Sequence, residues 1–296
     1  MRRSSLASDR ATDANDVVLV SADEALERVR PHLAGKLLLA TDFDGTISRL
    51  SMDMWAALVI PAAQRALRRL AGTPDTNVAF ISGRTVADLA PRVRVGSASY
   101  HGDHGAEWAR AGRGFRPERL AIEHEPVPPA TSAMAERLKA EVPRRVDQGW
   151  LVVEDKGPAV TFHFRRAPDI PAARAQVRAA IDAVDREGLL DQPGGRRAWE
   201  LRPRGAMTKG RTLSRLIERH QPDTVVMMGD DAHDAGAFDA LRSVRDQGRI
   251  AGLAIAVASP AADTAEMAQR ADLVFGHAHV TARFLSLLVR ERVVPG

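Results

Sequence analysis

The apolar positions of this chain follow two different periods, and segments with one period alternate with segments of the other. Short continuous apolar runs of strand length occur at 36–41, 77–81, 224–229, 251–259 and 271–276. Apolar residues spaced for one face of a helix occur at 61–70, from Thr85 onward, at 208–220 and at 280–293. Strands that alternate with helices in this order predict an α/β fold, with a parallel sheet covered by helices on both faces.

The middle of the chain has a different pattern. Two segments, at 130–142 and 171–187, have apolar residues along one helical stripe. Between them, Val160, Phe162 and Phe164 alternate with polar residues, as in a strand with one buried face. We therefore predict an inserted α+β domain, in which helices cover the apolar face of a small sheet and leave a charged face open.

Three regions follow from these patterns. The polar residues 1–15 contain no apolar run long enough for a signal peptide and are predicted to form a disordered tail. Residues 16–111 and 203–296 are predicted to form the α/β core, and residues 112–202 the inserted domain. No run approaches the roughly 18 apolar residues of a membrane span, so we expect no membrane partner.

The composition narrows the expected partners and location. The 296 residues include no cysteine, so there is no disulfide and no thiolate ligand or nucleophile, which fits a cytoplasmic protein. The net charge is +4, but the basic residues are spread along the chain and only 4% of residues are aromatic. This pattern is not typical of nucleic-acid binding and predicts a small anionic substrate instead. We expect a monomer or a weak dimer.

The apolar run at 36–41 ends on two carboxylates, Asp42 and Asp44. Ligands of a parallel α/β sheet bind beyond the carboxyl ends of its strands, and residues two apart in an extended segment face the same side. Two adjacent carboxylates repel each other unless a cation lies between them or one is protonated. Mg²⁺ would relieve the repulsion, because it prefers oxygen ligands and leaves positions for phosphate.

Polar residues at other strand ends and helix starts add to this site. Asp230, Asp231 and Asp234 follow a second predicted strand and offer further carboxylates. Ser82 follows a third strand and offers a hydroxyl group. Lys209 opens a predicted helix, where backbone amides and the helix dipole favour an anion.

These residues together predict phosphoryl transfer. Asp42 would attack phosphorus and form an aspartyl phosphate, while Asp44 would protonate the leaving oxygen and later take a proton from water. Mg²⁺ would offset the repulsion between Asp42 and the phosphate dianion, and Ser82 and Lys209 would hold the phosphoryl oxygens. Each motif alone is also typical of a turn or a helix cap, but four of them in this order favour the chemistry.

The motifs "DFDGT", "ISGR", the Lys209–Gly210 helix start and "GDDAHDAGAF", in this order, resemble those of haloacid dehalogenase superfamily phosphatases. Within that superfamily, "HGDHGAEW", "EDKGPAVTFHFR" and "WELRPRG" resemble the trehalose-6-phosphate phosphatases. The resemblance extends from Leu37 to Leu285. It implies a Rossmann-like core, a mobile cap made by the inserted domain, and hydrolysis of trehalose-6-phosphate to trehalose and phosphate.

The resemblance also implies roles for individual residues. Asp42 would be the nucleophile and Asp44 the acid and base. Mg²⁺ would be held by Asp42, the backbone carbonyl of Asp44 and Asp230, with Asp231 and Asp234 close behind. The residues implied on the substrate side are Gly83, Arg84, His104, Glu107, Glu154, Lys156, His163, Arg165 and Glu200.

Several of these substrate-side residues also have a structural interpretation. The alternatives are a solvated sheet face for His163 and Arg165, a surface ion pair for Glu154 and Lys156, and a fixed turn for His104 and Glu107. The charged sheet face is derived from the alternating pattern, whereas a contact with sugar hydroxyls is implied only by the resemblance.

The sequence also departs from the family pattern, which usually has Thr and Glu where this chain has His233 and Ala235. One extra residue precedes Lys209. These departures keep other functions open. The alternatives are a phosphatase for a related sugar phosphate such as a trehalose-like pseudodisaccharide, a phosphomutase, and a non-catalytic sugar-phosphate-binding protein.

Overall fold

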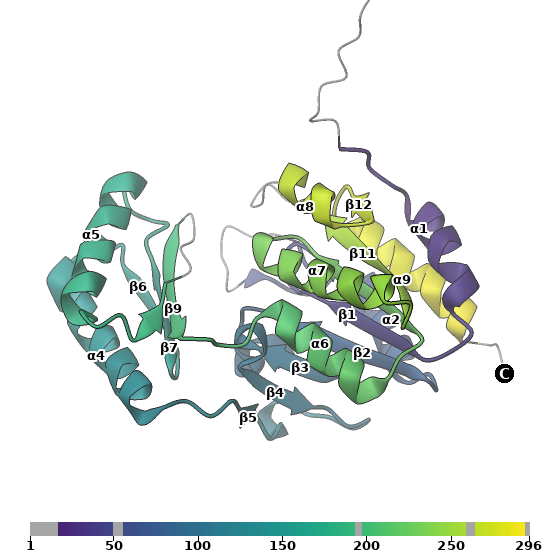
Figure 1. The fold of residues 1–296 in the computed structure, drawn as a ribbon, viewed down its shortest axis with the longest axis horizontal. Coiled ribbons are helices and arrows are strands. Elements are labelled where there is room, and N and C mark those ends of the chain that lie inside the picture. Colours follow the sequence, from purple (N-terminus) through teal and green to yellow (C-terminus); the bar gives the residue numbers. More distant parts are fainter. Residues whose placement is uncertain (1–16, 50–55, 193–196, 259–263, 294–296) are drawn as a thin grey trace, which may run out of the picture.

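A computed structural model describes residues 17–49, 56–192, 197–258 and 264–293 of the chain (Figure 1). Within these residues, eight strands form one sheet in the order β12-β11-β10-β1-β2-β3-β4-β5. The strands are β1 (Leu37–Thr41), β2 (Thr76–Ile81), β3 (Ser99–Gly102), β4 (Glu107–Arg110), β5 (Glu123–His124), β10 (Thr224–Gly229), β11 (Ala251–Val257) and β12 (Leu273–Phe275). The central strand β1 pairs in parallel with both β10 and β2.

Helices cover both faces of this large sheet. One face is covered by α1 (Ala22–Val29), α2 (Pro61–Ala71), α3 (Val86–Val93) and α9 (Ala278–Arg292). The other face is covered by α6 (Lys209–His220), α7 (Ala232–Asp246) and α8 (Thr264–Arg270). Successive side chains of β1 alternate between these layers, since Leu37 and Leu39 pack in the first and Leu38 and Ala40 in the second.

A second sheet lies beside the first (Figure 1) and is antiparallel, in the order β6-β7-β9-β8. Its elements are α4 (Pro129–Val146), β6 (Val152–Lys156), β7 (Ala159–His163), α5 (Ile170–Val184), β8 (Leu190–Asp191) and β9 (Ala198–Pro203). The apolar side chains of Val160, Phe162 and Leu201 pack with α4 and α5 in a separate core. On the other face, Thr161 lies between Glu154 and Glu200 across three strands. The alternating pattern therefore predicted the two faces of this sheet.

The predicted α/β class is confirmed, with differences at one edge and in one helix. Strands β4 and β5 pair antiparallel with their neighbours, so the sheet is mixed rather than wholly parallel. Strand β5 belongs to the large sheet, although residues 123–124 fall in the segment predicted for the inserted domain. Helix α7 follows Asp231 directly, whereas the sequence patterns predict a strand end there and no helix. The tail predicted at 1–15 lies outside the described residues.

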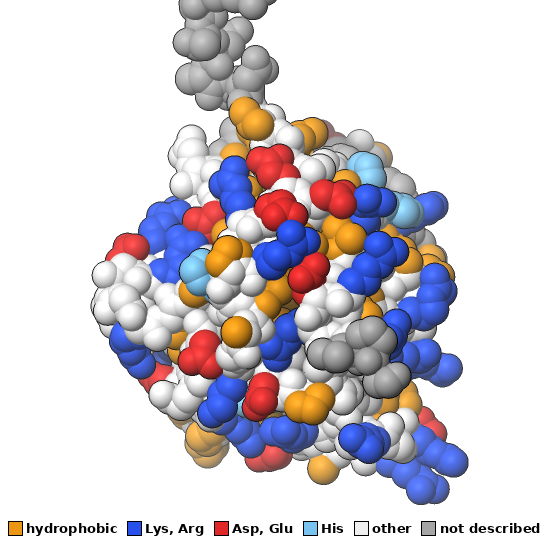
Figure 2. All heavy atoms as spheres, turned by 90° about the vertical axis from the view of Figure 1, so that its right-hand side faces the viewer, with side chains coloured by type: hydrophobic (Ala, Val, Ile, Leu, Met, Phe, Trp, Pro, Cys, Tyr) orange, Lys and Arg blue, Asp and Glu red, His pale blue; other side chains and the backbone are white. Residues whose placement is uncertain are grey.

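The surface turned away from the small sheet is shown in Figure 2. Basic side chains are interspersed there with acidic and apolar ones over much of the face. No helix in the described ranges is both long enough and apolar enough to cross a membrane.

Candidate active site

The carboxyl ends of three neighbouring parallel strands bring the predicted residues to one edge of the large sheet. Asp42 follows β1, Ser82 follows β2 and Asp230 follows β10. In the pairing register, Thr41 at the end of β1 lies opposite Met228 near the end of β10 and Phe80 near the end of β2. The backbone N–H of Asp42 donates to the carbonyl of Met228 at 2.9 Å. These three residues therefore lie together at one edge of the sheet, as their positions after strands predict.

Lys209 lies at the start of α6, where the side chain of Thr208 caps the helix. Its Nζ lies 2.8 Å from Oδ1 of Asp42, 2.8 Å from Oδ1 of Asp234 and 3.8 Å from Asp231, and the side chain is buried. Burial opposes the charged form of Lys209, but the three carboxylates outweigh it and raise its pKa. The extra residue before Lys209 therefore does not displace the ammonium group from Asp42.

Asp42 is itself almost fully buried. Burial raises the pKa of Asp42 to about 6, and the nearby ammonium group of Lys209 opposes this rise. At neutral pH the carboxylate is therefore ionised, and it lies next to a cation that also could attract an anionic ligand.

Asp231 and Asp234 shape the loop behind these groups. The side chain of Asp231 accepts from the backbone N–H groups of His233 and Asp234, which caps α7. In return, Oδ2 of Asp234 accepts from the backbone N–H groups of Asp230 and Asp231 at 3.1 and 3.2 Å. Asp234 thus fixes the backbone that carries Asp230.

Three buried carboxylates could hold a metal ion here. Oxygen atoms of Asp42, Asp230 and Asp234 lie within 4.8 Å of one another. A set of carboxylate oxygens suits a hard divalent cation. Gly45 has φ +71°, and a Cβ there would lie 2.1 Å from Oδ2 of Asp230, so only glycine lets the loop approach this carboxylate. The donor set therefore fits the metal expected from the sequence, with Asp234 near the ligands as well.

Asp44 is placed differently from the expectation. The chain turns directly after Asp42 instead of continuing as a strand, so the period-two argument for a shared side does not apply. The Asp44 carboxylate instead accepts two hydrogen bonds from Arg84, from Nε at 2.6 Å and from Nη2 at 2.9 Å. Arg84 also binds Asp88 at 2.6 Å. Asp44 is therefore half-exposed at the mouth of the site and oriented by an arginine.

Gly83, directly after Ser82, connects the two sheets through its backbone carbonyl. Ser82 is buried, and its Oγ accepts from the backbone N–H of Arg84 at 3.2 Å. The carbonyl of Gly83 accepts from Nζ of Lys156, on β6 of the small sheet, at 2.9 Å. Lys156 also lies 3.1 Å from Glu200 and 3.9 Å from Asp103. Lys156 is therefore a buried contact between the two units and not a surface ion pair.

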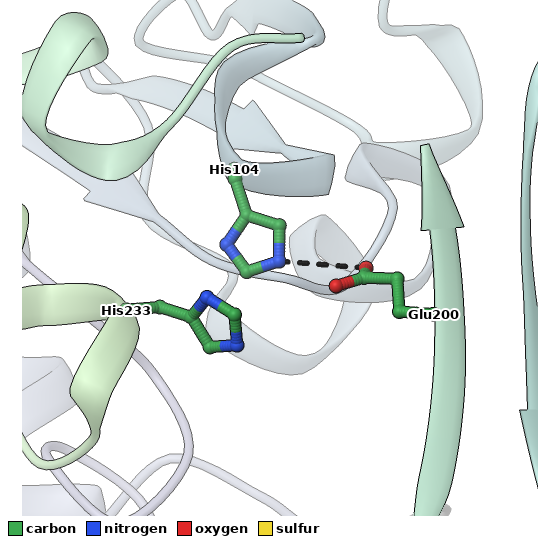
Figure 3. Close-up of side chains that lie close together, drawn as sticks. All are labelled: His104, Glu200 and His233. Atoms are coloured by element: carbon green, nitrogen blue, oxygen red, sulfur yellow. Dashed lines mark ion pairs between the residues drawn. The ribbon is translucent and has the colours of Figure 1, made fainter. Parts of the chain in front are cut away.

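Glu200 is the second link between the units. Its Oε1 lies 3.5 Å from Nε2 of His104 (Figure 3). Its other oxygen lies 3.7 Å from Nε of Arg202. Burial would raise the pKa of Glu200, but His104, Lys156 and Arg202 hold it well below its usual value. Burial lowers the pKa of His104 to about 4. His104 therefore is a neutral imidazole that faces the small sheet.

The remaining substrate-side candidates divide into two groups. His163 and Glu154 form a half-buried pair at 2.8 Å on the charged face of the small sheet. Arg165 is exposed and lies beyond the end of β7. Glu107 accepts from the backbone N–H of Val86 and lies 3.5 Å from His124. The contacts of Glu107 match the turn-fixing interpretation that the sequence left open.

Asp103 and Arg202 in this region were not predicted from the sequence, and His233 was noted there only as a departure from the family pattern. Asp103 and Arg202 both lie close to the Lys156–Glu200 pair. The ring of His233 contacts that of His104, with centroids 4.7 Å apart and the ring planes tilted by 39°. Asp103 and His104 both have positive φ, 44° and 58°, which is uncommon for residues other than glycine. The two His-Gly pairs of "HGDHG" indicate a turn in the sequence, but they do not indicate which side chains face the small sheet.

The fold resembles that of haloacid dehalogenase-like hydrolases. A crystal structure of such a hydrolase from Bacteroides thetaiotaomicron matches with a TM-score of 0.55, covering 86% of this chain and 99% of the other at 16% identity. The C-terminal domain of C. albicans trehalose-6-phosphate phosphatase matches with a TM-score of 0.73, covering 93% of this chain and 99% of the other at 19% identity. These two likenesses concern the fold.

Sequence similarity identifies the family. The profile of the trehalose-phosphatase family matches residues 40–271. The trehalose-phosphate phosphatase of Mycobacterium avium (strain 104) is 35% identical over 81% of this chain. The chain therefore belongs to the trehalose-phosphatase family. It spans 60% of the length of that relative.

Proposed function

We propose that the chain is a Mg²⁺-dependent phosphatase that hydrolyses trehalose-6-phosphate to trehalose and phosphate. The observation that supports this most directly is the contact of the buried Asp42 with Lys209 beside Asp230, at the carboxyl edge of the sheet. A nucleophile, a cation for phosphate and a metal site are thus adjacent. Family membership supports the sugar phosphate as the substrate. A cytoplasmic enzyme that acts as a monomer or weak dimer fits this role.

The proposed reaction has two steps. Asp42 attacks phosphorus, the bond from phosphorus to the sugar oxygen breaks, and that oxygen takes a proton from Asp44. Asp44 then removes a proton from water, which attacks the aspartyl phosphate and releases phosphate and the free Asp42 carboxylate. Bound Mg²⁺ supplies positive charge that reduces the repulsion between carboxylate and phosphate.

The other residues position the reacting groups. Lys209 and the Ser82 hydroxyl hold phosphoryl oxygens, and Arg84 orients Asp44. Asp42 and Asp230, with the backbone carbonyl of Asp44, would hold the metal, and Asp231 and Asp234 fix the loop behind it. We further propose that residues 112–202 form a cap whose charged sheet face contacts the sugar. The cap residues for this contact are Glu154, Lys156, His163, Arg165 and Glu200, with Gly83, His104 and Glu107 from the core.

The test is phosphate release from a panel of substrates, with Mg²⁺ and with a chelator. The panel contains trehalose-6-phosphate, glucose-6-phosphate, sucrose-6-phosphate and an aryl phosphate. We expect strong preference for trehalose-6-phosphate and loss of turnover with chelator. If only the aryl phosphate is hydrolysed, the proposed mechanism stands, but trehalose-6-phosphate is not the substrate. Asp42→Asn should abolish turnover; a binding protein would have no turnover to lose.

One observation favours a second candidate, a phosphatase for a related sugar phosphate. His233 stands where the trehalose-6-phosphate phosphatases usually have threonine, and its ring contacts that of His104. A bulkier residue at this place would alter the shape available to a sugar. Preferential turnover of a different disaccharide phosphate in the panel would support this alternative.

A further inference from the structure

We propose that His104, Glu200 and His233 form a binding site for one Zn²⁺ ion that joins the large-sheet unit to the small-sheet unit. Their ligand atoms lie within 4.8 Å of one another. His104 and His233 come from the core and Glu200 from β9, and the three side chains converge (Figure 3). This site is separate from the carboxylate cluster of Asp42, and it shares His104 and Glu200 with the sugar contact proposed above.

The distance between Glu200 and His104 fits a shared metal better than a hydrogen bond. Nε2 of His104 and Oε1 of Glu200 are 3.5 Å apart, whereas a good hydrogen bond between such atoms is about 2.7–3.2 Å long. Two ligands at about 2.1 Å from a tetrahedral ion lie about 3.4 Å apart. The two atoms are therefore separated as neighbouring ligands of one tetrahedral ion would be.

The ligand types select the metal. Two imidazoles and one carboxylate form a typical three-ligand zinc set, with a fourth position left for water or a substrate oxygen. Mg²⁺ prefers oxygen ligands and would favour the Asp42 cluster. The Nδ1 atom of His104 is buried without a hydrogen-bond partner in the described part of the chain.

The charged groups around the three residues have both signs, because Lys156 and Arg202 lie 3.1 and 3.7 Å from Glu200, whereas Asp231 lies near His233. Oε1 of Glu200 is shared with Lys156, but Lys156 also contacts the Gly83 carbonyl and lies near Asp103. Lys156 therefore keeps partners when Glu200 binds a metal. Asp231 accepts from the backbone N–H of His233, and its carboxylate adds negative charge near the His233 ring.

The experiment titrates the full-length protein with Zn²⁺ by calorimetry, with Mg²⁺ in excess to occupy the carboxylate cluster. The variants are His233→Thr, which changes an exposed residue, and Glu200→Gln, which changes the opposite side of the interface. We expect the wild type to bind one equivalent and each variant to bind roughly 100-fold more weakly or not at all. Circular dichroism and metal-free melting would check that each variant is folded.

The matched control is His279→Thr. His277 and His279 form an exposed pair with ring centroids 5.7 Å apart and are the rival place for Zn²⁺. We expect this variant to bind Zn²⁺ as the wild type does. Unchanged affinity in His233→Thr, or loss of binding in His279→Thr, would overturn the site. Loss in His233→Thr with full affinity in Glu200→Gln would overturn the link between the two units.

Discussion

At the scale of single residues, the site depends on one buried ammonium group. Lys209 is 2% exposed and lies among the carboxylates of Asp42, Asp231 and Asp234. Burying charges is costly unless they are paired. The same residue that would bind phosphate therefore also stabilises the fold around the carboxylates when no ligand is bound.

Replacing this lysine should destabilise the protein as well as inactivate it. Lys209→Met leaves buried carboxylates without their cation, and we expect a loss of about 3–5 kcal/mol of unfolding free energy. Added Mg²⁺ should restore part of the loss, because it binds the same carboxylates. Urea unfolding with and without Mg²⁺ measures both effects. The exposed Lys36→Met is the control, and equal stability of the two variants would contradict the prediction.

His101 should make the stability of the fold sensitive to mild acid. Burial lowers the pKa of His101 from 6.5 to about 4, with Arg219 and His220 adding to the effect. The His101 imidazole is therefore protonated near pH 6.5 in the unfolded chain but only near pH 4 in the folded protein. His101 thus contributes a loss of stability, on the order of 3 kcal/mol, as pH falls through this window.

The comparison of the wild type with His101→Gln isolates this contribution. Unfolding free energies of both proteins are measured from pH 7 downward. The variant should lose less stability between pH 6.5 and 4 than the wild type. Parallel pH profiles would show that His101 is not the group responsible.

The predictable site residues are those whose position follows from strand ends. Asp42, Ser82 and Asp230 follow three strands, and parallel strands end at one edge whatever their order in the sequence. The orientation of Asp44 could not be predicted, because it depends on a turn and on Arg84 from the next strand's loop. Likewise, the approach of His233 to His104 needs the tertiary fold.

At the scale of elements, the close packing of α6 on α7 explains a glycine that has no other evident role. A Cβ on Gly210 would lie 2.5 Å from the backbone oxygen of Gly236. Neither backbone can move easily, because α6 carries Lys209 and α7 begins at the Asp231 cap. The crossing of these two helices thereby fixes the distance between Lys209 and Asp234.

The two glycines at this crossing should respond differently to the same change. Gly210→Ala should cost about 1–3 kcal/mol of unfolding free energy, because the added methyl group overlaps backbone atoms. Gly236→Ala should be neutral or stabilising by up to about 1 kcal/mol, because its Cβ has space and alanine favours a helix. Thermal or urea unfolding of the two variants tests this, and a reversed order would contradict the packing argument.

Sequence patterns predicted long elements better than short ones. The apolar run before Asp42 matches β1, and the alternation around Phe162 matches β7 with its buried face. Strand β5 has only two residues, both exposed, so it has no apolar alternation to detect. Helix α7 begins with polar and small residues, so it has no clear apolar stripe at its start. The carboxylates that form its capping box were interpreted only as the end of a strand.

At the scale of the whole molecule, a few polar contacts join the two units. Lys156 and Glu200 reach from the small sheet to Gly83 and His104 of the core. Each unit has its own apolar core. Relative motion of units joined mainly by polar contacts is the usual expectation.

Removing the lysine link should therefore open the molecule. Lys156→Ala should increase the radius of gyration in small-angle scattering and raise KM more than it lowers kcat. Lys139→Ala is the matched control, because Lys139 pairs with Glu136 and Asp155 inside the small unit. An unchanged scattering profile for Lys156→Ala in the absence of substrate would contradict this role.

The strand order of the large sheet also has a consequence for how the protein is made. The central strand β1 pairs with β10, whose residues Thr224–Gly229 leave the ribosome long after it. Until then, the face of β1 that carries Leu38 and Ala40 lacks its cover of α6 and α7. The small sheet is contiguous in sequence and can form during this interval. We therefore expect the nascent chain to need chaperone protection on one side of its earliest strand, until its final third has been translated.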